Sequence, residues 1–346
     1  MISRLKLLQK MKIDNDLLKK YLSDKNLIKS DDIIESKEIG RGAFNVNHLV
    51  KTNSGKNFLF RFIIWSMRDH IDDMAKYESL VLKNLSELNI SPKLILLDET
   101  RNVFSYPLII EEYIDGKTIK QSQDKFVEQI INSLPIVIKL YREGKTVGLT
   151  SQTEIISNEL LERKLECFEK YNSPLAKIIS SHKDTIIKFT GNCNKLLDEK
   201  VFVHGDLNPE NYIYSKDDKW YLVDWQSPFV GDASFDIATL LWDFYWKFFI
   251  GKPLEAEQKE LIKKRYCDLS NTDIAVLNKK IEAVTIFLDF DMLTRIEYLL
   301  LKLIHGSERL GVQDEEKNFI VENRVAPARA LLVSEKILSD IISRMN

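Results

Sequence analysis

The chain has 346 residues, 44% of them hydrophobic, which is enough for one large domain or two lobes with a substantial core. Its charges nearly cancel at −2, so no overall field points to a nucleic acid or an anionic membrane as partner. Three scattered cysteines without a CxxC pair argue against a disulfide framework or a zinc site and suit a reducing cytoplasm. The basic first turns are not typical of a signal peptide, and the most apolar window, 239–250, is too short and too charged to span a membrane.

Residues 13–34 have helical spacing of apolar residues and predict an amphipathic helix with a connector. From residue 39 to 63 the pattern predicts three strands, joined by a glycine-rich turn and then an Asn-Ser-Gly turn. Glycines at 40 and 42 would let backbone amides approach a phosphate closely, and Asn45 tolerates the left-handed conformations of such a turn. An ordinary hairpin turn explains Gly40, Gly42 and Asn45 equally well when they are considered alone.

The third of these strands places a cation among apolar residues. Alternation puts the phenylalanines of FLFRF on one face and Arg61 on the other, where its charge needs a partner or an anion. The following stretch, 72–88, predicts a helix whose apolar stripe contains one acid, Glu78. We expect Glu78 to face Arg61, either to hold it toward a phosphate or as an ion pair of purely structural use.

Two further apolar runs, 93–99 and 106–113, would complete a five-stranded antiparallel sheet that carries one helix. Beyond the segment EEYIDG the pattern becomes helical, with helices predicted over 124–141, 156–171 and 175–197. The chain therefore predicts a small sheet-based part followed by a larger helical part.

The residues most suggestive of chemistry lie in 201–238. Two short apolar runs there are separated by HGDLNPEN, and the second pairs with WYLV to predict a hairpin that brings Asn211 and Asp224 to one end, beside the loop carrying Asp206. Converging carboxylate and amide oxygens suit Mg²⁺, and phosphoryl transfer uses one Asp near the acceptor hydroxyl with Asn and a second Asp on the metal. Each residue alone is a common turn former, but turn chemistry does not require this combination.

HGDLNPEN followed by VDWQSPFVGDASFDIA resembles the signature of the aminoglycoside phosphotransferase and choline kinase superfamily, the small-molecule branch of the protein-kinase-like fold. The resemblance implies that Asp206 is the catalytic base and that Asn211 and Asp224 bind Mg²⁺. It also implies that Asp236 braces the catalytic loop through backbone hydrogen bonds. We expect His204 to brace the same loop rather than to act as a metal ligand or catalyst.

This resemblance implies an α+β, two-lobed fold with a small antiparallel sheet lobe and a larger mainly helical lobe. The expected parts are a helical extension (1–35), the nucleotide-binding lobe (36–111), a hinge (112–117) and the catalytic lobe (118–346). ATP would lie between the lobes, with its phosphates on the glycine turn and Arg61, and its purine on the hinge backbone near Glu112 and Ile114. Backbone contacts have no side-chain signature, so GTP remains possible. Arg61 stands where protein kinases have lysine, and Asn45 where they have a third glycine.

Aromatic and acidic residues of the larger lobe are weaker candidates for substrate contacts. Residues 235–249 predict one helix with two apolar stripes, and Trp242 and Trp246 on one of them would pack in the core or form an aromatic wall for a substrate. Asp289 and Asp291 lie on a later predicted helix, where they would contact a cationic or hydroxyl-rich substrate or be solvated.

The expected acceptor is a small hydroxylated molecule, because the chain has no DFG or APE motif and no activation segment that would hold a protein substrate. Aminoglycosides, amino alcohols, sugars and homoserine-like compounds all suit the same catalytic loop. A non-catalytic nucleotide-binding relative and an atypical protein kinase are the alternatives. The sequence leaves the oligomeric state open.

Overall fold

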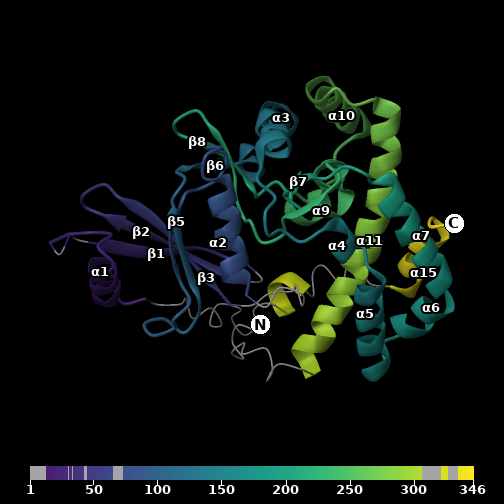
Figure 1. Cartoon of the computed structure of the whole chain (residues 1–346), viewed down its shortest axis with the longest axis horizontal. Helices are drawn as coiled ribbons and strands as arrows, with labels where there is room; N and C mark the ends of the chain where they lie inside the picture. Colours follow the sequence, from purple (N-terminus) through teal and green to yellow (C-terminus); the bar gives the residue numbers. More distant parts are fainter. Residues whose placement is uncertain are drawn as a thin grey trace, which may run out of the picture.

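The computed structural model describes residues 13–29, 31–32, 34–42, 45–64, 73–305, 321–325 and 334–346. Within these residues a sheet-based lobe is followed by a mainly helical lobe, so the expected α+β, two-lobed class is confirmed (Figure 1). The first 12 residues of the expected extension and positions 43–44 of the glycine turn lie outside the described residues.

The first lobe is built on an antiparallel sheet in the strand order β1-β2-β3-β5-β4. The predicted five-stranded sheet is therefore confirmed, although its first strand begins five residues before the predicted position. Its strands are β1 (Ile34–Arg41), β2 (Asn45–Thr52), β3 (Asn57–Ile63), β4 (Leu94–Asp98) and β5 (Leu108–Glu112).

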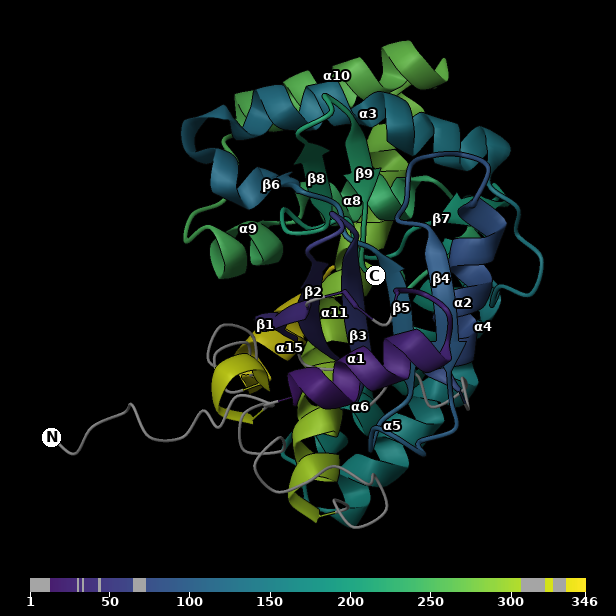
Figure 2. The same cartoon turned by 90° about the vertical axis from the view of Figure 1, so that its left-hand side faces the viewer.

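The two faces of this sheet carry different helices, as Figure 2 shows for the helix α1 in front of the strands. Helix α1 (Asn15–Asp24) packs its apolar side on the face that carries Phe58, Phe60 and Phe62. Helix α2 (Met74–Leu85) lies on the opposite face, against β4 and β5. The period-2 alternation of β3 therefore sends its phenylalanines to one core and Arg61 to the side of the cleft.

The second lobe is assembled around the long helix α11 (Ile274–His305), against which α8 packs through the edge-to-face pair of Phe235 and Phe287. In the described residues no helix is both long enough and apolar enough to cross a membrane. The other helices are η1 (Ile119–Lys125), α3 (Phe126–Glu143), α4 (Gln152–Ile155), α5 (Asn158–Lys170), α6 (Leu175–Ser181), α7 (Lys183–Leu196), α8 (Ser234–Leu241), α9 (Asp243–Phe249), α10 (Ala256–Ser270), the π-helix η2 (Val321–Val325) and α15 (Glu335–Ser343).

Two predicted helices are each broken into two. The stretch 175–197 divides at His182, between α6 and α7. The stretch 235–249 divides at Trp242, whose ψ of 121° is not helical. Side chains bond across this second break, since Trp246 Nε1 donates to the Leu240 carbonyl at 2.7 Å. The helical apolar pattern therefore did not predict this break, across which a side chain bonds to the backbone.

Two small sheets support the segment that contains Asp206, Asn211 and Asp224. Strand β8 (Tyr212–Ser215) pairs with β9 (Trp220–Leu222), which confirms the predicted hairpin, and β6 (Gly116–Thr118) adds to its other edge. Strands β7 (Val201–Val203) and β10 (Phe229–Gly231) form the second sheet. Because β6 follows β5 closely, the connection between the lobes is attached directly to the hairpin that ends at Asp224.

Candidate active site

The loop after β7 makes a sharp turn at Gly205, whose φ of +77° is left-handed. A Cβ at this position would lie 2.1 Å from the Ser227 carbonyl oxygen, so only glycine fits without displacement of the backbone. This turn directs the next residue, Asp206, away from β7 and toward the β8–β9 hairpin.

Asp236, at the start of α8, is bonded to the backbone of this turn. Its carboxylate accepts the N–H groups of His204 and Gly205, each at 2.8 Å, and the hydroxyl of Tyr141 at 3.2 Å. The His204 ring bonds the Val223 carbonyl at 3.1 Å, and burial lowers the pKa of this histidine to about 4. A neutral imidazole and a buried carboxylate therefore fix the loop between β7 and β9.

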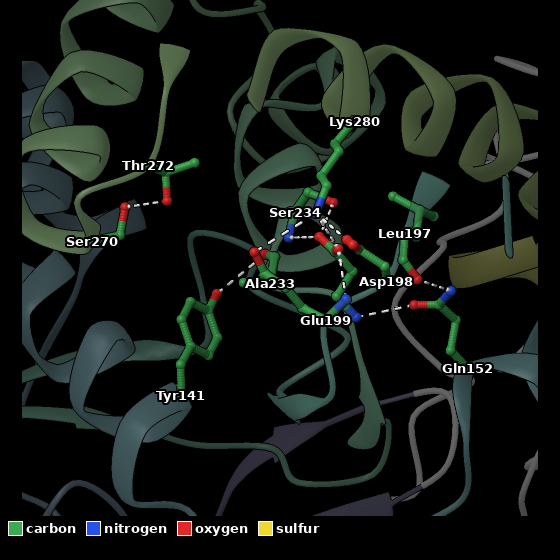
Figure 3. Close-up of polar contacts among 11 residues, drawn as sticks. Tyr141, Gln152, Leu197, Asp198, Glu199, Ala233, Ser234, Ser270, Thr272 and Lys280 are labelled. Carbon is green, nitrogen blue, oxygen red and sulfur yellow. Dashed lines mark hydrogen bonds and ion pairs between the residues drawn. The ribbon is translucent and has the colours of Figure 1, made fainter. Parts of the chain in front are cut away.

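A second cluster fixes the segment that leads into α8 (Figure 3). Lys280 of α11 points down toward Asp198 and Glu199, and its Nζ lies 2.7 Å from Asp232, just before α8. Asp232 also accepts the backbone N–H and hydroxyl of Ser234. The position of α8, and with it Asp236, is therefore set by a buried ion pair as well as by apolar packing.

Asp206, the expected catalytic base, has both carboxylate oxygens engaged. Tyr245 of α9 donates to Oδ1 at 2.7 Å, and the amide of Asn211 donates to Oδ2 at 3.1 Å. Burial and the charge of Asp224 raise the Asp206 pKa to about 7, while these hydrogen bonds act to lower it. An oriented carboxyl with a pKa near neutrality has the properties of a general base.

Asp224 follows β9 in a left-handed conformation, with a φ of 68° that is uncommon for a residue other than glycine. Its carboxylate contacts the Arg61 guanidinium, which also lies 2.8 Å from Glu78. Burial disfavours the charge of Arg61, but Asp224 and Glu78 raise its pKa above the usual value. The ion pair of Arg61 and Glu78 was predicted from the sequence; the bridge from Arg61 across to Asp224 was not.

A cleft of about 360 Å³ lies between the sheet and the hairpin. Its lining comes from the glycine-turn strands, from β3, from the connection after β5 and from the end of the hairpin. Among the residues predicted from the sequence, those that line it are Gly40, Gly42, Asn45, Arg61, Glu112, Ile114, Asn211 and Asp224. Asp206 lies next to this cleft, joined to it by the Asn211 amide.

Asn211 and Asp224 offer a donor set that suits a hard cation. In the described residues there is no group of three or more His, Cys, Asp or Glu side chains that would hold a metal alone. Mg²⁺ is commonly held by one or two carboxylates and completes its shell with phosphate oxygens and water. One carboxylate and one amide at the cleft therefore fit Mg²⁺ bound together with a phosphate, but not a metal bound by protein alone.

The four candidate substrate residues do not line this cleft. Trp246 is only 1% exposed and packs edge-to-face on Phe126 in the core. Trp242 donates to Asp289 at 2.7 Å, and both line a separate hollow of about 620 Å³ between α9, α10 and α11. Asp291 was expected on a solvated face or at a substrate, but it is buried and paired with Lys164 at 2.7 Å and with Arg295.

Two residues of the site, Tyr245 and Glu111, were not predicted from the sequence. Tyr245 is one of several aromatics on its helix, and no sequence signal marks its hydroxyl as the partner of Asp206. Glu111 lines the cleft and is buried beside Arg61. It had a signal of the same kind as Arg61, because alternation in LIIEE puts it on the same face as Ile109, where an apolar residue is expected.

A model of the family described as "Phosphotransferase enzyme family" matches residues 159–272, a range that includes the catalytic loop and the hairpin. This match agrees with the superfamily expected from the sequence motifs.

Solved structures show the same fold over almost the full chain. The choline kinase LicA from Streptococcus pneumoniae is 20% identical, with a TM-score of 0.58, over 91% of this chain and 98% of that one. An ethanolamine kinase from Plasmodium vivax is 16% identical, with a TM-score of 0.60, over 93% and 98%. The spectinomycin phosphotransferase APH(9)-Ia, solved with ADP and spectinomycin, is 11% identical, with a TM-score of 0.59, over 96% and 98%. At these identities the likeness establishes the fold and not the substrate.

Proposed function

We propose that this phosphotransferase moves the γ-phosphate of ATP to a hydroxyl group of a small molecule, with Asp206 as the catalytic base. The observation that carries the proposal is the grouping of Asp206, Asn211 and Asp224 at one end of a cleft. Asn211 bonds Asp206 directly, and the charge of Asp224 acts on the same carboxyl. The structurally similar spectinomycin phosphotransferase APH(9)-Ia, solved with ADP and spectinomycin, supports a nucleotide in the cleft.

The phosphates would lie at the end of the cleft where Arg61 and the strands of the glycine turn face Asp224. Arg61 is held by Glu78, so its planar fork is already oriented before a nucleotide enters. The base would lie at the other end, along the backbone near Glu112 and Ile114. Phosphoryl transfer depends mainly on positioning and on charge stabilisation, and this arrangement supplies both.

Asn211 and Asp224 would hold Mg²⁺, which neutralises charge on the phosphates when bound. The chain itself orients the acceptor. Asp206 Oδ1 already accepts the Tyr245 hydroxyl, and its remaining lone pair is free to accept the proton of an acceptor hydroxyl. Tyr245 and Asn211 thus keep the carboxylate in one orientation during the transfer.

The proposed acceptor is a small hydroxylated molecule of one of four classes: an aminoglycoside, an amino alcohol, a sugar or a homoserine-like compound. A screen of such compounds with Mg-ATP, monitored by ADP release and by the mass of the phosphorylated product, tests the proposal. We expect at least one acceptor to give ADP in the wild-type protein and in the exposed control variant Asp217→Ala, but not in Asp224→Ala. ADP release that depends only on added protein substrates would contradict a small acceptor, and no release with any acceptor would contradict the enzymatic assignment.

A further inference from the structure

Glu111 occupies the inner wall of the cleft, directly before the segment that would hold the base. It is the fourth residue of β5 and pairs with Leu59 of the neighbouring strand, two residues from Arg61 on the same face of the sheet. Its residue surface is 5% exposed, and what remains accessible lines the cleft. The carboxyl is therefore shielded from solvent except through the place where a nucleotide would bind.

This carboxyl differs from its acidic neighbours because nothing bonds to it. Glu78 and Asp224 both contact Arg61. In the described part of the chain, Glu111 has no side-chain hydrogen bond and no ion pair. Burial raises its pKa to about 8, and the nearby Glu78 and Asp224 charges act in the same direction, against the effect of Arg61. At neutral pH the group is thus a largely buried, uncharged carboxyl without a partner among the described residues, and its accessible surface faces the cleft.

An uncharged carboxyl offers one donor, its O–H, and one acceptor, its carbonyl oxygen. Adenine presents the complementary pair on the edge that carries N7 and the 6-amino group, the edge that an Asn or Gln amide reads in DNA. Guanine presents two acceptors there, N7 and O6, and a neutral carboxyl has only one donor to give. The 6-amino group carries a second hydrogen on the side of N1, so a contact of that side with the hinge backbone would leave the N7 side for Glu111.

We propose that the protonated Glu111 carboxyl binds the N7 and 6-amino groups of adenine and makes the enzyme select ATP over GTP. The inference rests on the proposed function, because it requires a nucleotide in this cleft. It goes further by assigning base selection to one side chain of this chain. The competing interpretation is that Glu111 only balances the charge of Arg61, and in that case its removal would weaken the binding of all nucleoside triphosphates equally.

Direct binding measurements separate these interpretations. Mg-ATP, Mg-GTP and Mg-7-deaza-ATP, which lacks N7, would be titrated calorimetrically into the wild-type protein, Glu111→Gln and Glu111→Leu. The glutamine amide keeps one donor and one acceptor, whereas leucine removes both. We expect the wild-type protein to bind ATP about 5- to 100-fold more tightly than GTP or 7-deaza-ATP. Glu111→Gln would keep both preferences, and Glu111→Leu would lose them.

Equal affinity of the wild-type protein for the three nucleotides, or an ATP preference that persists in Glu111→Leu, would overturn the inference while leaving the proposed function intact. No binding of any nucleotide to the wild-type protein would overturn both. Thermal unfolding of each variant checks its fold. If Glu111→Leu does not fold, the comparison of ATP with 7-deaza-ATP in the wild-type protein still tests whether N7 is bound, because it needs no variant.

Discussion

The acidic side chains on the two sides of the cleft differ in whether their oxygens accept hydrogen bonds. On the helical side, Asp206 and Asp236 each accept hydrogen bonds on both oxygens. On the sheet side, within the described residues, Glu111 has no hydrogen bond or ion pair, and one oxygen of Glu78 and the amide oxygen of Asn47 are buried without a hydrogen bond. The carboxylates of Asp206 and Asp236 are thus fully hydrogen-bonded without a ligand, and those of Glu78 and Glu111 are not. The contrast holds for the acids only, because Tyr212 Oη and Gln226 Nε2 on the helical side are also buried without a hydrogen bond.

The difference indicates two ways of preparing a site. The loop that carries Asp206 is held in a fixed geometry, as the proposed transfer reaction would require for its base to be aligned before the substrate arrives. The sheet side keeps unpaired polar groups, which weaken the folded state and are satisfied when a ligand binds. Substitutions on the helical side should therefore reduce stability, and those of unpaired groups on the sheet side should increase it.

The largest expected effect is for Asp236→Ala. The variant leaves two buried backbone N–H groups without an acceptor, each costing about 1–3 kcal/mol, so we expect a loss of roughly 4 kcal/mol in the free energy of unfolding. Urea denaturation measures it, with the exposed Asp217→Ala as control. A loss equal to that of the control would show that the loop does not depend on these bonds.

Arg61 joins the two sides, and Arg61→Met should cost about 3 kcal/mol because it leaves the buried Glu78 unpaired. The affinity for Mg-ATP should fall at least about tenfold, since charge-assisted bonds to phosphate are lost. Calorimetry and urea denaturation report the two effects. The exposed Arg142→Met, on α3, is the control, and an unchanged ATP affinity in Arg61→Met would remove Arg61 from the phosphate site.

Glu111→Gln should stabilise the ligand-free protein. The folded Glu111 pKa of about 8 lies above the ordinary value of 4.5, so the wild type loses stability as pH rises between these values. Glutamine does not titrate, so the gain should grow across this window to on the order of 2 kcal/mol, with Arg61, Glu78 and Asp224 as the charged neighbours. Denaturation at pH 5 and pH 8.5 measures it, with Glu112→Gln as control. A gain that is the same at both pH values would contradict the buried, unpaired state of Glu111.

The smallest effect is expected for Tyr245→Phe. Loss of the hydroxyl removes a hydrogen bond that lowers the Asp206 pKa, so that pKa should rise by about one unit. The acidic limb of the pH profile of kcat/KM would then move to higher pH. Tyr214→Phe, which removes an exposed hydroxyl from the hairpin, is the control. If the acidic limb of the profile does not move, the Tyr245 hydroxyl does not affect the Asp206 pKa and the side chain contributes only packing.

The sequence predicted those features that depend on a short period or a compact motif. Alternation in β3 placed Arg61 correctly, and the single acid in the apolar stripe of the next helix identified its partner Glu78. The turn between two apolar runs predicted the hairpin that ends at Asp224. These features are local, so tertiary packing has little opportunity to change them.

The remaining features depend on contacts between distant segments. Asp291 looked like a solvated helix position because its partner Lys164 is 127 residues away and no local pattern links them. Trp242, where the predicted helix breaks, bonds to Asp289 on another helix, and no local pattern marks this contact. Tyr245 follows this break and bonds to Asp206, which is 39 residues away in the sequence. The alternation argument that found Arg61 also applied to Glu111, but two acids at the end of a strand resemble the start of a loop.

Asp206→Asn tests the central claim most directly, because asparagine keeps the size of the side chain and its oxygen can still accept the Tyr245 hydroxyl, but it cannot take up the acceptor proton. The rate of γ-phosphate transfer and the affinity for Mg-ATP would be measured side by side, with an acceptor from the screen. We predict that the transfer rate falls by at least about 10²-fold while the ATP dissociation constant is nearly unchanged. Transfer at the wild-type rate would contradict the assignment of Asp206 as the catalytic base.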